Sequence, residues 1–122
     1  DWITYYRDYP DLSNIYNNNS SFMSNSLTEG FGLVSVEAML CGCALVCTDI
    51  AGHKEYAIDG ETALLVEPKN PVDMAEKMTY LINNGDERVR LAKQGYGYVQ
   101  RFSWDSSVKK MDKLITQLLK KD

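Results

Sequence analysis

Two acidic side chains stand eight residues apart around a glycine-framed turn, in the stretch Glu29–Glu37, written EGFGLVSVE. Gly30 and Gly32 let the main chain bend sharply and approach a ligand closely, because neither has a Cβ. The apolar residues after Gly32 predict a helix whose first turn offers unpaired N–H groups and a partial positive charge, which suits a phosphate. Glu37 could then accept hydrogen bonds from hydroxyls, and Glu29 would lie near whatever is attached to the phosphate. Alternatively, both acids serve only the helix dipole, at about 0.3–1 kcal/mol each.

Other segments extend this pattern along nearly the whole chain. The EGFGLVSVE stretch continues as AMLCG, and it is accompanied by Phe22–Ser26, Ala44–Cys47, Gly52–Glu55, Asp59–Gly60, Leu64–Val66 and Phe102–Trp104. Together they resemble the donor-binding domain of the retaining glycosyltransferases of group 1, or family 4, whose donor-site signature is E-x7-E. That signature alone would be a weak signal, whereas the full set at this spacing is a strong one.

The resemblance implies a role for individual residues. Glu37 matches the acid that holds the ribose hydroxyls of the donor, and Glu29 matches the acid that contacts the transferred sugar and would position it. The main-chain groups expected to meet the sugar and the diphosphate are those of Gly30, Phe31, Gly32 and Leu33. Arg7 falls near the place where the family packs the base, although it could equally be a solvated loop cation.

The implied activity is the transfer of a sugar from a nucleoside diphosphate to an acceptor hydroxyl, with retention at the anomeric carbon. The resemblance implies no metal and no cofactor beyond the nucleotide sugar itself. Two other interpretations remain open. A nucleotide-sugar epimerase of related fold would rearrange the donor instead of transferring its sugar. A non-catalytic nucleotide-sugar-binding module would do neither.

Short apolar segments alternate with helical ones, which predicts an α/β fold with a parallel sheet. The expected strands are 21–24, 44–48 and 62–67, after a short β-rich run at 2–6. The expected helices are 11–16, one that begins after Gly32, one that begins at Asn70-Pro71 and stops at Asn84-Gly85, 86–101, and one capped by Ser103. Ligands of open α/β sheets bind beyond the carboxyl ends of the strands, so Glu29–Glu37 should lie at that edge.

The resemblance also implies how much of an enzyme the chain represents. Residues 1–122 would be a partial donor-binding domain, Rossmann-like, from the C-terminal half of a two-domain GT-B glycosyltransferase and truncated at its N-terminal side. The family's domain begins with two further strands, which carry an arginine and a lysine for the diphosphate, and an acceptor-binding domain completes the enzyme. We therefore expect the chain to bind a nucleotide sugar weakly and to self-associate through an open sheet edge and an apolar stripe that includes Trp104, Val108 and Met111.

Composition agrees with one domain that has a single core. The chain has 122 residues, of which 44% are hydrophobic and 25% charged, as in ordinary globular domains. The net charge of −4 argues against a general nucleic-acid or membrane-surface binder, which would normally show a basic patch. Without a membrane-length apolar run or a signal peptide in the sequence, a cytoplasmic location is expected.

Three cysteines and one histidine complete the candidate groups. Cys41, Cys43 and Cys47 lie within seven residues and are expected to be reduced, small apolar side chains, without a metal. His53 follows Gly52 and could face the donor, but a lone loop histidine is more often simply exposed. Glu55 matches an acid of the family pattern, or it could cap a short helix after it.

Overall fold

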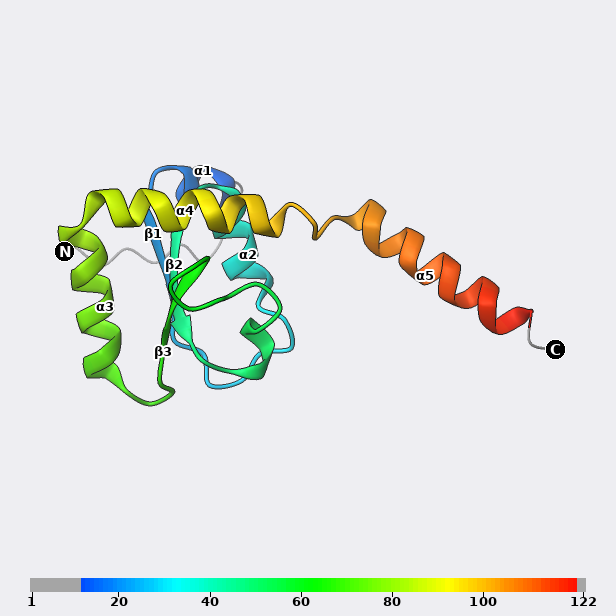
Figure 1. Ribbon diagram of the computed structural model, residues 1–122, viewed down its shortest axis with the longest axis horizontal. Helices are drawn as coiled ribbons and strands as arrows, with labels where there is room; N and C mark the ends of the chain where they lie inside the picture. Colours follow the sequence, from blue (N-terminus) through cyan, green and yellow to red (C-terminus); the bar gives the residue numbers. More distant parts are fainter. Residues whose placement is uncertain (1–11, 121–122) are drawn as a thin grey trace.

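A computed structural model describes residues 12–120 of the chain, which form a parallel sheet flanked by helices. The strands β1 (Ser21–Ser24), β2 (Ala44–Thr48) and β3 (Ala63–Val66) lie side by side in that order. All pairings are parallel, with Ser21 opposite Ala44 and Leu45 opposite Ala63, so the three carboxyl ends share one edge (Figure 1). The α/β class and the parallel sheet predicted from the sequence are confirmed. The β-rich run at 2–6 lies outside the described residues.

The helices follow the sequence signals closely. They are α1 (Leu12–Asn17), α2 (Leu33–Leu40), the short 3-10 helix η1 (Ala51–His53), α3 (Pro71–Asn83), α4 (Gly85–Val99) and α5 (Trp104–Leu119). Asn70 caps α3 by accepting a hydrogen bond from the N–H of Asp73, and Ser103 caps α5 by accepting one from Ser106. These bonds satisfy N–H groups that a helix start leaves unpaired. α4 begins at Gly85, immediately after the Asn84 that ends α3.

The central strand β2 holds the domain together because it is buried on both faces. All five of its residues are buried, as is typical of a parallel strand covered by helices on both sides. Leu45 and Cys47 pack into a core with α2, whereas Ala44 and Val46 pack into a second core with α3. The expectation of a single core is therefore wrong, because helices cover both faces of the sheet. α4 contributes to both cores, through the side chains of Val99 and Leu91 respectively. Loops at the ends of β2 are therefore anchored to a fully buried strand.

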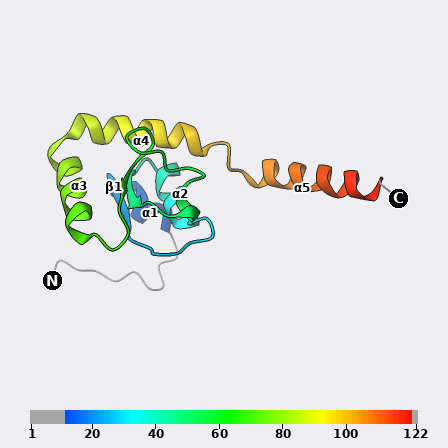
Figure 2. The same cartoon turned by 60° about the horizontal axis from the view of Figure 1, so that its bottom comes forward.

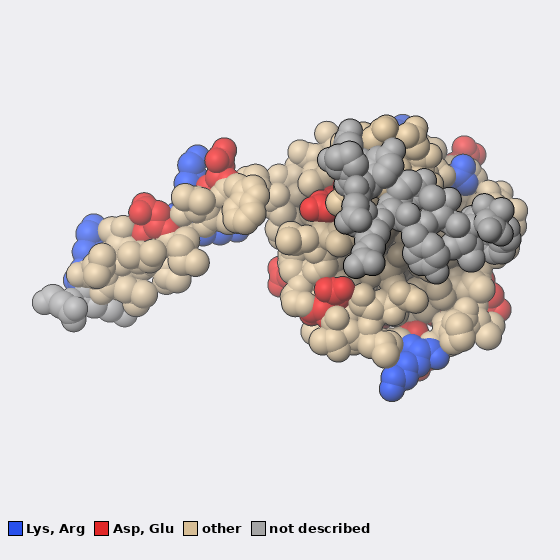
Figure 3. Space-filling model, turned by 180° about the vertical axis from the view of Figure 1, so that it is seen from behind, with Lys and Arg blue, Asp and Glu red and all other residues tan. Residues whose placement is uncertain are grey.

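The last helix, α5, extends away from the sheet and its flanking helices in both ribbon views (Figures 1 and 2). No residue of α5 is buried, and Trp104 is 85% exposed. Its apolar side chains form the stripe named here the α5 stripe, which consists of Trp104, Val108, Met111, Leu114, Ile115, Leu118 and Leu119, each exposed. Lysines and acids alternate along the same helix (Figure 3). Within residues 12–120, no helix has the length and apolar character needed to cross a membrane.

We expect the α5 stripe to drive self-association, because exposed apolar patches of this kind associate in water. Replacing Val108 and Ile115 together by lysine should convert an associated chain into a monomer in sedimentation velocity experiments. Because neither side chain is buried, the free energy of unfolding should change by no more than about 0.5 kcal/mol.

A matched control replaces the polar Thr116 and Gln117 by lysine, which adds the same charge to the same helix. The control should remain associated. A stable monomer of the unaltered chain at high concentration would contradict the prediction.

Candidate functional site

The loop between β1 and α2, residues 25–32, carries the groups that the sequence singled out for ligand binding. It leaves the carboxyl end of β1 and reaches α2 through Gly32, whose backbone is left-handed, with φ 79° and ψ 55°. A residue with a Cβ adopts that conformation only with strain, so glycine is needed here. Leu33 and Val34, in the first turn of α2, are more than half exposed. No side chain caps this helix start, so its first N–H groups remain available to a ligand.

This loop rests directly on η1, the turn that follows β2. A Cβ built on Gly52 would lie 2.2 Å from the carbonyl oxygen of Glu29. A Cβ built on Gly32 would lie 2.5 Å from the Tyr56 hydroxyl and 3.2 Å from the His53 ring. Two glycines thus allow two loops to touch at distances that no other residue permits, and the contact fixes the height of Glu29 and Gly32 above the sheet.

A chain of hydrogen bonds connects η1 to the carboxylate of Glu29. His53 Nδ1 donates to the carbonyl oxygen of Thr48 at 2.8 Å, and Thr48 Oγ1 donates to the carbonyl oxygen of Ser26 at 2.5 Å. Ser26 Oγ in turn donates to Glu29 Oε1 at 2.8 Å. Glu29 is exposed to solvent, yet its carboxylate is oriented by groups that reach back to the end of β2.

His53 is fully buried, so the expectation that it would be exposed is wrong. The reason is the fold of η1, which turns the ring inward into the space that Gly32 leaves empty. A carbonyl oxygen can only accept, so Nδ1 carries the hydrogen and the neutral ring has its lone pair on Nε2. Among the described residues, Nε2 has no hydrogen-bond partner.

Glu55 is exposed and caps no helix, because the chain forms a turn after η1 instead of a helix. Its carbonyl oxygen accepts a hydrogen bond from Arg101 at 2.8 Å.

Aromatic packing around Phe31 holds the glycine loop against the core. The sequence singled out Phe31 but not its neighbour Tyr56. The Phe31 ring packs edge-on against Tyr56 and against Phe102, with centroid distances of 5.3 and 5.2 Å. Burial is the main cause that raises the pKa of Tyr56 to about 12. The phenol therefore stays protonated near neutral pH and donates to the carbonyl oxygen of Gly32 at 3.3 Å. Gly32 was the available signal, because a Cβ at that position would meet the Tyr56 hydroxyl.

Glu37 lies in a different environment from Glu29. It is exposed on α2 and borders a groove of about 280 Å³ between α1 and α2, lined by Leu12, Ser13, Tyr16, Glu37, Leu40 and Cys41. The pKa of Tyr16 is raised, mainly by burial and further by the nearby Glu37 carboxylate. Arg7, the other expected contact, lies outside the described residues. The structure thus places Glu29, Gly30, Phe31, Gly32 and Leu33 around one helix start, with Glu37 one turn further along the helix.

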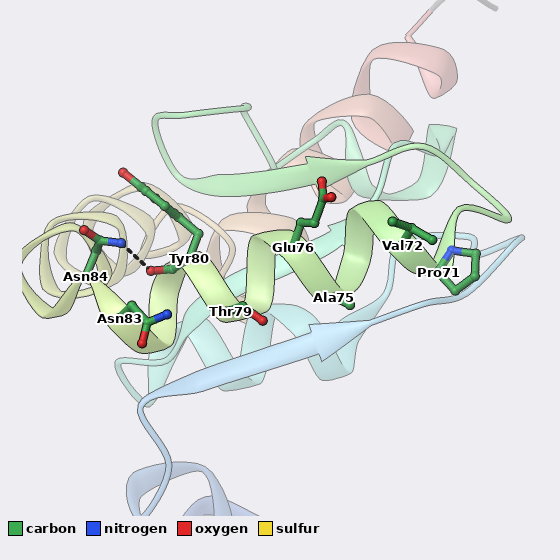
Figure 4. A pocket seen from close by; sticks show the side chains of 8 residues that line it. All are labelled: Pro71, Val72, Ala75, Glu76, Thr79, Tyr80, Asn83 and Asn84. Carbon is green, nitrogen blue, oxygen red and sulfur yellow. Dashed lines mark hydrogen bonds between the residues drawn. The ribbon is translucent and has the colours of Figure 1, made fainter.

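Larger hollows lie elsewhere on the described part of the chain. One of about 680 Å³ runs along the outer face of α3 and is lined by that helix and Asn84 alone (Figure 4). There the Asn84 side chain donates to the carbonyl oxygen of Tyr80 at 2.8 Å. Another of about 570 Å³ lies at the carboxyl ends of the strands, bordered by Thr48 and Val66. Among the described residues, no group of three His, Cys, Asp or Glu side chains is placed to hold a metal ion, and the three cysteines are free.

Comparison with known families decides the class of protein. The family described as "Glycosyl transferases group 1" matches residues 2–98. The chain belongs to this family. A relative named "Uncharacterized glycosyltransferase MJ1178", from Methanocaldococcus jannaschii, is 40% identical over 93 residues, which cover 76% of this chain and 26% of the relative. The chain spans about a quarter of the length of the curated relatives it matches.

Solved structures agree with the group 1 assignment. The sucrose-phosphate synthase (tll1590) of Thermosynechococcus elongatus aligns with a TM-score of 0.82 and 29% identity, over 88% of this chain and 27% of that one. The fold is also shared with Anabaena Alr3699/HepE, solved in complex with UDP-glucose, at a TM-score of 0.73 and 24% identity over 88% of this chain and 29% of that one. The structural neighbours are GT-B glycosyltransferases, and the match falls in their C-terminal domain region. The predicted GT-B origin of the fold is confirmed.

The contact between the two loops makes a prediction about stability. We expect Gly52→Ala to cost about 1–3 kcal/mol of unfolding free energy, because the new methyl group would overlap the Glu29 carbonyl and force the loops apart. Chemical denaturation measures this directly. Gly30→Ala is the matched control, since a Cβ there meets no atom within 4 Å, and it should change stability little. Equal effects of the two substitutions would show that the loops are not held by this contact.

Proposed function

We propose that the chain forms the donor-binding part of a retaining glycosyltransferase of family 4, which uses a nucleoside-diphosphate sugar. The observation that carries this proposal is the uncapped start of α2, where the exposed residues Leu33 and Val34 stand between the carboxylates of Glu29 and Glu37. An anion is favoured at such a start by the unpaired N–H groups and by the helix dipole. Membership of group 1 and the UDP-glucose complex of HepE support a nucleotide sugar as that anion.

The proposed chemistry uses the helix start during bond cleavage. As the glycosidic bond of the donor breaks, negative charge builds on the leaving diphosphate. N–H groups that are already oriented toward that charge stabilise it in the transition state without reorganising. The amides around Phe31, Gly32 and Leu33 would contact the diphosphate, and Glu29 would orient the transferred sugar. Glu37 would bind the ribose hydroxyls in the groove between α1 and α2.

The acceptor would be an alcohol of a glycan or small molecule, bound by a domain that this chain does not contain. The chain spans about a quarter of the length of its curated relatives. We therefore propose the transfer of the sugar for the whole enzyme and not for this chain alone. The epimerase and the non-catalytic module are not favoured, since the relatives are glycosyltransferases. The assignment of Arg7 to the base, the self-association and the cytoplasmic location stay predictions.

Glu37→Gln tests the ribose assignment, because it keeps the shape of the side chain and removes its charge. Hydrogen bonds to a charged group contribute about 1.5–3 kcal/mol, so the affinity for UDP-glucose should fall roughly tenfold or more in calorimetry. Glu76→Gln on α3 removes an exposed acid far along the chain from this helix start and should leave the affinity unchanged. An unchanged affinity of the Glu37 variant would refute the ribose assignment.

Kinetics of the whole transferase separate Glu29 from Glu37. If Glu29 orients the sugar more strongly in the transition state than in the ground state, Glu29→Ala should lower kcat far more than it raises KM. Ser26→Ala removes the hydrogen bond that orients this carboxylate and should cause a smaller loss of the same kind. Intact turnover in Glu29→Ala would reduce this residue to a charge near a helix start.

A further inference from the structure

His53 Nε2 is unusual among the polar atoms of this domain. Within residues 12–120, it is the one buried side-chain nitrogen or oxygen without a hydrogen-bond partner. A buried acceptor left unpaired is destabilising, so its presence needs a reason. Nδ1 is already used by the carbonyl oxygen of Thr48, which fixes the ring and leaves Nε2 as the free position.

This free nitrogen lies directly behind the start of α2. A Cβ on Gly32, the residue that begins the helix, would be 3.4 Å from Nε2. The ring therefore approaches the uncapped start of α2 from inside the molecule, while Leu33 and Val34 are exposed on the outside. A charge on His53 would act on an anion bound there across one turn of main chain.

Ionisable groups around His53 come from β2, from the turn after η1 and from the loop before α2. Burial raises the pKa of the Cys47 thiol on β2 and of Tyr56 to about 12 in each case, so both are neutral. At the end of β2, Asp49 pairs with Lys54 at 3.8 Å.

On the loop above, the carboxylate of Glu29 accepts the hydrogen bond from Ser26. Ser35 on α2, whose side chain hydrogen-bonds with Tyr56, does not titrate near neutral pH. Imidazole, by contrast, ordinarily changes charge between pH 5 and 8.

We propose that His53 takes up a proton on Nε2 when a diphosphate binds at the start of α2, so that donor binding and proton binding are coupled. The inference rests on the proposed function, because it needs a diphosphate at that site. Without a ligand, the positive end of α2 disfavours a second positive charge beside it. A bound diphosphate reverses the local potential and favours the imidazolium.

The proton comes from solvent, and the bond from Nδ1 to Thr48 is retained. Because coupling is reciprocal, the donor binds more tightly as the pH falls. His53 is thus a positioning residue that acts on the donor through the Gly32 turn.

The chain has a single histidine, so its NMR signal can be followed without assignment in the untagged chain. UDP-glucose is the probe, because both of its phosphates are esterified and its charge is constant between pH 5.5 and 8. Saturation with UDP-glucose should move the midpoint of the His53 titration upward by about one pH unit, which corresponds to a tenfold preference of the donor for the protonated chain. Uridine, which has no phosphate, should leave the midpoint unchanged.

His53→Asn supplies the matched variant, since its amide can still donate to Thr48 but does not titrate. Its affinity for UDP-glucose should be independent of pH, whereas that of the unaltered chain should rise as the pH falls from 8 to 5.5. A midpoint unmoved by bound UDP-glucose overturns this inference and leaves the donor site standing. Absence of UDP-glucose binding at any concentration overturns both. The titration of the unaltered chain decides the question even where the variant does not fold.

Discussion

The candidate site depends on the contact between two loops that leave neighbouring strands. Gly52 passes so close to the main chain of Glu29 that a Cβ would overlap the carbonyl oxygen at 2.2 Å. This contact is possible because β1 and β2 run parallel and end at the same edge of the sheet. The contact supports the glycine loop on η1 and holds it as a defined turn. Preorganised N–H groups stabilise charge only when they do not have to move, so the proposed donor binding would depend on this contact.

The support that η1 gives to this loop depends in turn on β2. Its residues are buried on both faces, and Thr48 at its end bonds to both loops, through its side chain to Ser26 and through its carbonyl oxygen to His53. Hydrogen bonds that share one residue couple the positions of the groups they join. The orientation of Glu29 is therefore linked to the His53 ring, which is buried behind Gly32, although Glu29 and His53 are far apart along the chain.

Local signals in the sequence predicted the elements well. The strands at 21–24 and 44–48 have the predicted bounds, because short apolar runs ended by polar residues define them, and the helices at Pro71 and Trp104 begin at the predicted caps. The inward turn of His53 was not predictable in this way. It depends on the absence of a Cβ at Gly32, twenty-one residues earlier, and periodicity within a segment does not report such pairings.

The spacing of the two glutamates follows from the geometry of the helix start. Gly32 must precede α2 in a left-handed conformation, so Glu29 stays in the loop before the N–H groups, while Glu37 lies one turn beyond them. Along α2, Ser35, Val36, Ala38 and Met39 are buried, and Glu37 occupies the exposed position between them. One inserted residue would rotate the following positions by about 100° and carry this carboxylate into the core. The spacing of eight residues therefore keeps one carboxylate on each side of the helix start while the apolar face of α2 stays on the sheet.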